Sequence, residues 1–393
     1  MTPKRIMMIA PTPYFADRGC HVRIYEEARA LQSRGHSVLI VTYHLGRDMG
    51  DIPVLRIPKI PWYRKLSAGP SWHKLYLDIF LLFKSLVAAQ GFKPDIIHAH
   101  LHEGAFLAAL AKRSFKTPIL FDCQGSLTGE LLDHGFVKKG RLRYRLFAKL
   151  EEWITRQVDH VVTSSTPTAD LIRRDFPEVA SRVTPLVDAV DTNLFRPMGK
   201  DSELLQSLDI TSGRKLIVYL GAMTKYQGVD LLLEAMQQLV QHRDDVHLLL
   251  MGYPHEQYRT KVQRMGLADH VSLTGKIDYE KAPCNLSLGD IAVSPKLSAT
   301  EANGKLMNYL ACGLPCVVFD TPINRELLGD LGLYVEQQDA VALSDALAGL
   351  LDDETRRQDL AARSRQAALE KHAWSARIEV LECVYKNMTT PPK

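Results

Sequence analysis

The stretch IAVSPKLSATEANGKLMNYLACGLPCVVFD, residues 291–320, holds a buried strand, a loop, a helix and a second strand, in that order. Residues 291–294 and 315–319 are short apolar runs of the kind found inside parallel sheets, and residues 305–312 have helical spacing of their apolar side chains. Two strands joined through a helix are typical of a parallel βαβ unit. The stretch therefore predicts an α/β fold.

The same alternation of strands and helices continues outward through both halves of the chain. In the first half we expect strands at residues 6–10, 37–42, 96–99, 119–122 and 160–163, with helices at 22–34 and 72–89. In the second half we expect strands at 216–220, 246–251 and 271–274, with helices at 229–241 and 258–265. The pattern breaks near residues 195–197. It predicts two doubly wound, Rossmann-like domains that face each other across a cleft.

Charge and cysteine usage limit the classes of partner. Residues 1–197 carry 28 Lys and Arg against 19 Asp and Glu, a net charge of +9, and the remainder has a net charge of −5. A basic first half suits a phosphate-bearing acceptor, a lipid headgroup surface or nucleic acid. The six cysteines contain no C-x-x-C pair, which indicates a reducing cytosol and neither a disulfide framework nor a zinc site. No apolar run approaches a membrane span or a signal peptide, so we expect neither.

Gly304 and Lys305 open the helix in the stretch quoted above. The free N–H groups at a helix N-terminus can hold a diphosphate, and a glycine there lets the backbone come close to it. A lysine in the first helical turn opposes the helix dipole, so its presence indicates a bound anion. The alternative is a solvated surface lysine that follows a loop glycine.

The segment from Glu301 to Pro315 resembles the donor-site signature of the family 4 glycosyltransferases, which have the GT-B fold. Further segments resemble that family in the same order along the chain: DIIHAH at 95–100, PLVDAVDTNLFRP at 185–197, GAMTKYQG at 221–228 and GLY at 332–334. The resemblance implies an N-terminal acceptor-binding domain, residues 1–197, and a C-terminal nucleotide-sugar-binding domain, residues 198–371. We expect a helix in residues 372–393 to pack back on the first domain.

The resemblance also implies a reaction. It is the transfer of a hexose from a UDP- or GDP-sugar to a hydroxyl acceptor, a lipid or glycan intermediate, with retention of the anomeric configuration. The nucleotide sugar is a co-substrate, and neither a cofactor nor a metal ion is expected. Cations and a helix N-terminus would do the work of a divalent ion, and the leaving phosphate would accept the proton of the acceptor.

Residue roles follow from matching positions in the family. We predict His100, Glu301 and Lys305 as the catalytic set, with Glu301 near the hydroxyls of the donor sugar. The predicted donor-binding residues are Gly19, Lys225, Ile277, Asn303, Gly304 and Asn308. The predicted acceptor-binding residues are His21, Arg23 and Gln124. No residue is predicted as a metal ligand.

The chain departs from the family pattern at three positions. Ala222 and Gln227 stand where relatives often have Arg and Lys, and Asn308 stands where many have a Glu that binds the ribose. We therefore expect Lys225 and Lys305 to supply the positive charge that the departing diphosphate needs. The plain alternative for Lys225 is a surface residue.

His100 ends a strand, at the edge where doubly wound sheets bind ligands, and the resemblance makes it a contact of the donor sugar. Gln124 follows the next strand along the chain and is expected to line the acceptor pocket. We expect His98 to point to the opposite face of its strand and to be structural.

Two basic segments, residues 59–83 and 138–147, interleave cations with aromatic side chains. Such segments suit an anionic membrane surface, and the alternative is a pair of solvated helix faces. We expect a cytoplasmic protein, peripheral on the inner membrane face. No nucleic-acid partner is expected, because no recognised binding module is present.

Other functions remain open on the sequence. The same fold serves nucleotide-sugar epimerases and inverting transferases. The substitutions at 222, 227 and 308 also fit a non-catalytic partner that lost its activity. A nicotinamide oxidoreductase is disfavoured, because no G-x-G-x-x-G follows the first strand of either half.

Overall fold

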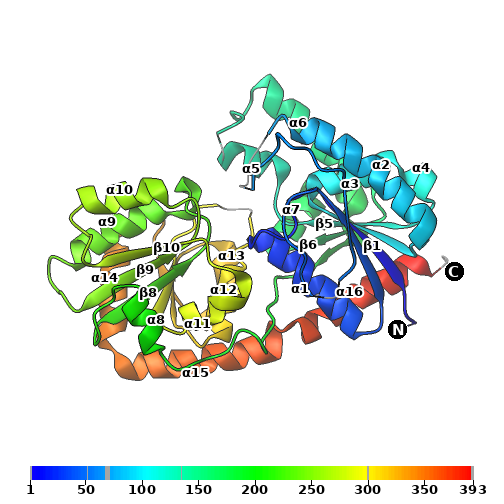
Figure 1. Ribbon diagram of the computed structural model, residues 1–393. Helices are drawn as coiled ribbons and strands as arrows, with labels where there is room; N and C mark the ends of the chain where they lie inside the picture. The colour runs from blue at the N-terminus through cyan, green and yellow to red at the C-terminus, as the bar shows by residue number, and fades with distance from the viewer. Residues whose placement is uncertain (1, 51, 67–70, 134, 299–300, 391–393) are drawn as a thin grey trace. The chain divides into compact units, whose positions relative to one another are not determined.

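A computed structural model describes residues 2–50, 52–66, 71–133, 135–298 and 301–390. By its internal contacts the chain forms two compact units (Figure 1). The first unit comprises residues 1–188 and 374–393 with the short segment 300–302, and the second comprises 189–299 and 303–373. The first unit therefore contains the described residues nearest to both ends of the chain.

The first unit is built on a seven-stranded parallel sheet with the order β3-β2-β1-β4-β5-β6-β7. Its strands are β1 (Arg5–Ala10), β2 (Ser37–Thr42), β3 (Val54–Arg56), β4 (Ile96–His100), β5 (Ile119–Cys123), β6 (His160–Thr163) and β7 (Val183–Pro185). Alternate residues of each strand face opposite helix layers. The strand order reverses between β1 and β4, which is where sheets of this kind bind ligands at their carboxyl edge.

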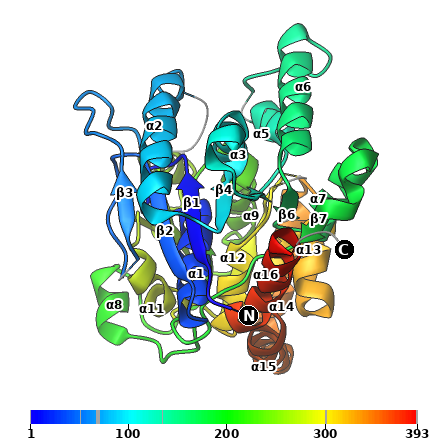
Figure 2. The same ribbon diagram turned by 90° about the vertical axis from the view of Figure 1, so that its right-hand side faces the viewer.

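Helices cover both faces of this sheet (Figure 2). One layer contains α2 (Lys74–Phe92), α3 (Leu101–Leu110) and α6 (Leu142–Gln157), with α3 packed against both of the others. On the other face α1 (Gly19–Ser33) packs against α16 (Trp374–Thr389). The remaining helical segments are α4 (Lys112–Phe115), α5 (Leu127–Asp133), α7 (Thr166–Asp175) and η1 (Pro177–Arg182).

Helix α16, at the end of the chain, is fixed to the first unit by buried polar contacts. The Trp374 indole Nε1 donates to Glu26 Oε2 at 2.7 Å, and the Tyr385 hydroxyl lies 2.8 Å from His98 Nδ1. Glu382 accepts from the Arg34 guanidinium at 2.9 Å. These contacts make α16 part of the wall behind β4.

The second unit is built on a six-stranded parallel sheet with the order β10-β9-β8-β11-β12-β13. Its strands are β8 (Lys215–Leu220), β9 (Val246–Met251), β10 (Val271–Gly275), β11 (Ile291–Ser294), β12 (Cys316–Phe319) and β13 (Gly332–Val335). Its helices are α8 (Ser202–Ser207), η2 (Lys225–Gln227), α9 (Val229–Leu239), α10 (Glu256–Arg264), η3 (Tyr279–Lys281), α11 (Ala282–Leu286), α12 (Lys305–Ala311), α13 (Pro322–Leu328), η4 (Gly329–Leu331), α14 (Ala340–Asp352) and α15 (Glu354–Lys371). Here the strand order reverses between β8 and β11.

The predicted fold class is confirmed, because both units are doubly wound parallel α/β sheets. Three strands that the sequence did not predict, β3, β7 and β13, lie at sheet edges and have three or four residues each. Runs so short contain too few alternations to show a period. Among the described residues, one helix, α2, could cross a membrane if only length and composition are considered. It packs, however, in the helix layer of the first unit.

Replacement of Trp374 by Ala should lower the free energy of unfolding by about 3–5 kcal/mol, the usual cost of emptying a large buried aromatic site. The change also removes the donor to Glu26 Oε2. Urea unfolding followed by circular dichroism measures the effect. Lys386→Ala, at an exposed position of the same helix, serves as the control and should change stability by less than about 0.5 kcal/mol. Equal effects of the two substitutions would contradict the packing described for α16.

Candidate active site

In the second unit the predicted donor residues gather where the strand order reverses. The loop after β8 contains Lys225 and Gln227, and Asn303 and Gly304 lie directly before α12, in the connection that follows β11. The carboxyl ends of neighbouring parallel strands meet at one edge of a sheet, so these two loops lie together. The topology therefore brings to one place residues that are about 80 positions apart in sequence.

Lys305 links the two loops. Its Nζ donates to Gln227 Oε1 at 2.6 Å and lies 4.5 Å from the centroid of the Tyr219 ring. A Cβ atom added to Gly221 would stand 2.7 Å from the same Nζ, so this glycine makes room for the lysine. The ammonium group thus lies beside Gly221, Tyr219 and Gln227. Gln227 is a direct partner of Lys305.

Gly228 allows the close approach of the two loops. Its φ is +74°, a conformation that side chains disfavour, and an added Cβ would collide with the carbonyl oxygen of Pro295. The backbone after β8 is thereby pressed against the segment that follows β11. A larger residue at 228 would push the two loops apart.

The amide side chain of Asn303 is part of the frame of the loop. It is buried, and its Nδ2 donates to Asn324 Oδ1 at 2.9 Å and to Ser294 Oγ at 3.1 Å. These bonds tie the residue before Gly304 to the end of β11 and to α13. The side chain is therefore committed to the protein, which leaves only the backbone of this residue for a ligand.

The other predicted donor residues lie around this frame. Asn308 is half-buried within α12. Glu301, predicted as a catalytic residue, is half-buried and belongs by its contacts to the first unit. Lys225 is exposed at the start of η2, and Ile277 is half-buried two residues after β10. Gly304 is the residue just before α12 and has an ordinary helical φ of −55°.

In the first unit a buried ion cluster lies at the carboxyl edge of the sheet. Arg23, on α1, donates to Asp122 Oδ1 at 2.9 Å and to Asp188 Oδ1 at 2.8 Å. Asp122 also accepts from Gln124 Nε2 at 2.8 Å and pairs with His100 Nδ1 at 2.9 Å. The cluster brings together three predicted site residues, Arg23, His100 and Gln124, around one carboxylate.

The protonation states of Asp122 and His100 depend on the neighbouring charges and on burial. Burial favours neutral Asp122, but Arg23 and then His100 outweigh burial and hold the pKa of this carboxyl well below its usual range. Burial lowers the pKa of His100, and the neighbouring His98 lowers it further, so its ring is neutral at pH 7. Because the ionised Asp122 can only accept, the Nδ1–H group of His100 donates to it and Nε2 carries the lone pair. Among the described residues no hydrogen-bond partner reaches His100 Nε2.

His98 lies on the same face of β4 as His100, and the expectation that it points the other way is wrong. Their rings stack with centroids 4.4 Å apart and planes 17° apart. Residues two apart in a strand share a face, so the alternation itself requires this arrangement. His98 pairs with Glu27 of α1 at 3.0 Å, which supports its predicted structural role.

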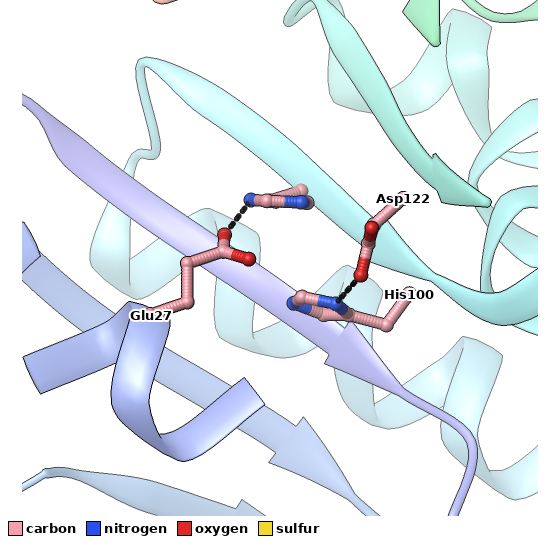
Figure 3. A group of neighbouring side chains, drawn as sticks. Glu27, His100 and Asp122 are labelled. Atoms are coloured by element: carbon pink, nitrogen blue, oxygen red, sulfur yellow. Dashed lines mark hydrogen bonds and ion pairs between the residues drawn. The ribbon is translucent and has the colours of Figure 1, made fainter. Parts of the chain in front are cut away.

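Glu27, His98, His100 and Asp122 form a buried group whose ligand-type atoms all lie within 4.8 Å of one another. Figure 3 shows Glu27, His100 and Asp122 pointing toward one another. The lone pair of an imidazole nitrogen lies in the plane of its ring, and two stacked rings cannot direct such lone pairs at one ion. Arg23 adds a cation beside Asp122. The geometry therefore favours pairing of these side chains with one another over a metal site.

Gly19 and His21 lie in the first turn of α1, which follows the loop after β1. Both ring nitrogens of the buried His21 have protein partners, because Nδ1 accepts from the Ala16 amide at 2.9 Å and Nε2 pairs with the Thr12 hydroxyl. His21 therefore shapes the loop rather than presenting a nitrogen to a ligand. Gly19, the first residue of α1, is exposed.

Sequence analysis missed the residues that hold the site together. Asp122 and Asp188 were not singled out. Asp122 ends the strand expected at residues 119–122, and Asp188 lies within the PLVDAVDTNLFRP motif at 185–197. A buried Arg requires carboxylate partners, so the prediction for Arg23 was a signal to look for them. Glu27 and Gln227 carried no such signal.

Comparisons with known proteins find two matching family models and similar sequences. Residues 18–186 match the family model described as glycosyl transferase 4-like domain, and residues 214–353 match that of glycosyl transferases group 1. The phosphatidyl-myo-inositol mannosyltransferase of Mycobacterium leprae is 24% identical over 98% of this chain and 97% of its own.

Solved structures have the same fold. Sucrose-phosphate synthase of Thermosynechococcus elongatus superposes with a TM-score of 0.81 and 18% identity over 98% of this chain and 99% of its own. HepE of Anabaena, solved in complex with UDP-glucose, gives a TM-score of 0.75 and 15% identity over 98% of this chain and 99% of its own.

Substitution of Asp122 by Asn should destabilise the first unit by about 3–5 kcal/mol, because it leaves Arg23 buried with half of its charge compensation. Since the pKa of Asp122 is depressed, the stabilisation is present above the unfolded pKa of about 3.9 and is lost as the pH falls through the lower folded value. The deficit should thus persist throughout the neutral range. Asp320→Asn, which breaks an exposed pair with Arg325, is the control and should leave thermal unfolding almost unchanged. A D122N chain as stable as D320N would refute the role of the cluster.

Proposed function

Because the chain belongs to the family 4 glycosyltransferases and has their GT-B fold, we propose that it transfers a hexose from a UDP- or GDP-sugar to a hydroxyl acceptor, with retention and without a metal ion. The two matching models together cover most of the chain. The enzyme is a glycosyltransferase, and the donor, the acceptor and the stereochemistry are the proposed part.

The position of Lys305 carries the proposal. Its ammonium group lies where the strand order of the second unit reverses and contacts the loop that follows β8. Sheets of this class bind phosphorylated ligands at that point. We assign the diphosphate of the donor to the space beside Lys305, Gly221 and the backbone of Asn303 and Gly304.

Lys305 and Lys225 would stabilise the departing diphosphate. Negative charge grows on the leaving group in the transition state, and fixed cations lower the barrier most where that charge develops. Lys225 is exposed in the loop after β8, the loop that also contains Gln227, the partner of Lys305. Glu301 and Asn308 would bind hydroxyl groups of the sugar and ribose, and the backbone near Ile277 would contact the base.

The acceptor hydroxyl is assigned to the first unit. Gln124 lies at the carboxyl edge of its sheet and would line the acceptor pocket. The neutral His100 lies at the same edge, and its Nε2 lone pair can accept a hydrogen bond from a hydroxyl of the donor sugar. His100 is fully buried here, so this contact requires neighbouring side chains to move. A role for His100 in positioning Asp122 and Gln124 needs no movement.

A lipid-linked acceptor at the inner face of the cytoplasmic membrane fits several features. The mycobacterial relative is named for a phosphatidylinositol acceptor. Residues 1–197 carry a net charge of +9, which suits a phosphate-bearing substrate. All six cysteines are free thiols, as in proteins of a reducing compartment.

For the stereochemistry we propose attack on the face from which the diphosphate leaves. The bond from the anomeric carbon to the phosphate oxygen breaks, a bond to the acceptor oxygen forms, and the phosphate takes the acceptor's proton. The protein needs to supply no nucleophile in this scheme, which suits a donor site built from cations and backbone amides.

Lys305→Ala should reduce kcat by about 100-fold or more, the usual effect of removing one group that stabilises developing charge. Product formation from UDP- and GDP-hexoses, followed by chromatography, provides the rate. Lys281→Ala removes an exposed lysine of the same unit and is the matched control, with kcat expected to stay unchanged. Full activity of K305A would remove the basis of the proposal, and a wild-type chain inactive with every donor would favour a non-catalytic partner.

The anomeric configuration of the product tests the stereochemistry directly. NMR of the product should show the same configuration as the donor, and excess EDTA should leave the rate unchanged, because cationic side chains replace a metal ion. An inverted product, a sugar epimerised without transfer, or activity lost to EDTA and restored by Mg²⁺ would each contradict the proposed mechanism.

A further inference from the structure

Helix α2 presents apolar side chains to solvent on its outward side. The positions on this side, four residues apart, are Leu75, Ile79, Phe83 and Val87, and the exposed fraction of each lies between 55% and 74%. The outward face of a surface helix is ordinarily polar, while here the inward face is apolar as well. We call these four residues the α2 stripe. A stripe of this kind marks a surface that meets another apolar phase.

Two tryptophans flank the first turn of α2. Trp62 and Trp72 are 72% and 68% exposed, respectively. Trp72 stacks on His73 with centroids 3.9 Å apart, and the Trp62 indole donates to the Tyr76 hydroxyl at 3.2 Å. Tryptophan combines an apolar body with a polar N–H group and is enriched where a bilayer meets water.

Helix α6 and the turn before it carry a dense positive charge. The exposed cations are Lys138, Lys139, Arg141, Arg143, Arg145 and Lys149. Residues 135–150 contain no Asp or Glu, and within the described parts of the chain none of these cations has an ion-pair partner. Leu142 and Leu146 stand exposed among them. We call the six exposed lysines and arginines the α6 cations. Their charge favours an anionic partner.

The α2 stripe and the α6 cations belong to one helix layer. Helix α3 packs against both α2 and α6, and both views show the three helices side by side (Figures 1 and 2). Each helix returns from the carboxyl end of one strand to the start of the next, so the first turns of α2 and α6 lie at the carboxyl edge of the sheet. His100 and Gln124 lie at this same edge.

Further cations gather at the first turn of α2. Burial lowers the pKa of Lys65, and the nearby charges of Lys74 and Arg18 lower it further. Lys74 is itself paired with Glu103 at the start of α3. Cations crowd here beside the tryptophans, where the headgroups of an anionic bilayer would lie if the stripe entered it.

We propose that this layer of the first unit docks on an anionic bilayer. The α2 stripe enters the boundary of the acyl chains, Trp62 and Trp72 lie among the headgroups, and the α6 cations bind lipid phosphates. The idea rests on the proposed function, since a lipid-linked hydroxyl must reach the carboxyl edge that the docked layer adjoins. A second copy of the chain is a poor occupant, because two such cationic surfaces repel each other.

Vesicle co-sedimentation of the full chain tests the proposal. One set of vesicles contains phosphatidylcholine alone, and the other contains phosphatidylcholine with phosphatidylglycerol. The double variants I79Q/F83Q and R143Q/R145Q alter the stripe and the cations at exposed positions. Matched controls in the second unit are V341Q/L369Q and R356Q/K371Q, which change exposed residues of the same kinds.

We expect the wild-type chain to sediment with the anionic vesicles only and to be released by high salt. The affinity of each first-unit variant for anionic vesicles should fall by about tenfold or more, and each control should bind like the wild type. Absence of vesicle binding, or equal binding by I79Q/F83Q and the wild type, would overturn the proposal. So would a dimer in gel filtration that I79Q/F83Q dissociates, because the stripe would then be an interface between copies.

A thermal shift with UDP and GDP, measured on the same samples, separates this proposal from the donor site. If a nucleotide raises the melting temperature of a chain that does not bind vesicles, the result refutes the docking surface and supports the donor site. Vesicle binding by a chain that no nucleotide stabilises would do the reverse.

Discussion

A single buried guanidinium, that of Arg23, organises the carboxyl edge of the first sheet. Its charge cannot remain in the interior without Asp122 and Asp188, so it joins helix α1, strand β5 and the segment after β7. Asp122 in turn fixes the proton of His100 on Nδ1 and holds the amide of Gln124. The side chains of the first unit that we assign to the substrates are thus placed by one electrostatic requirement, and α16 packs behind the cluster through the contact of Tyr385 with His98.

The second unit places its cation by topology. Lys305 comes from the helix after β11, and its partner Gln227 comes from the loop after β8. The two strands are neighbours in the sheet, and the missing side chains of Gly221 and Gly228 let lysine and loop come together. In the proposed donor site, Lys305 would supply the positive charge that the family resemblance leads us to expect at 222 and 227. The charge is supplied from the opposite loop, and position 227 holds the amide that receives it.

The fold could be predicted from the sequence because its central strands are continuous apolar runs and its long helices have a clear period. The short edge strands β3, β7 and β13 escaped, since a strand of three or four residues has no readable period. Motif matching singled out Lys305, Asn303 and His100 as candidates, but could not show which side chains are engaged by the protein. Asn303 and His21 proved to be committed to internal hydrogen bonds. Their partners lie on other elements, and only the folded chain brings them together.

The account depends on a diphosphate site in the second unit. Isothermal titration calorimetry of the wild-type chain with UDP and with GDP measures that site most directly. We predict saturable binding of at least one of the two at a ratio of one nucleotide per chain, with or without EDTA. A titration in which neither nucleotide produces heat of binding at the highest soluble concentrations would contradict the central claim.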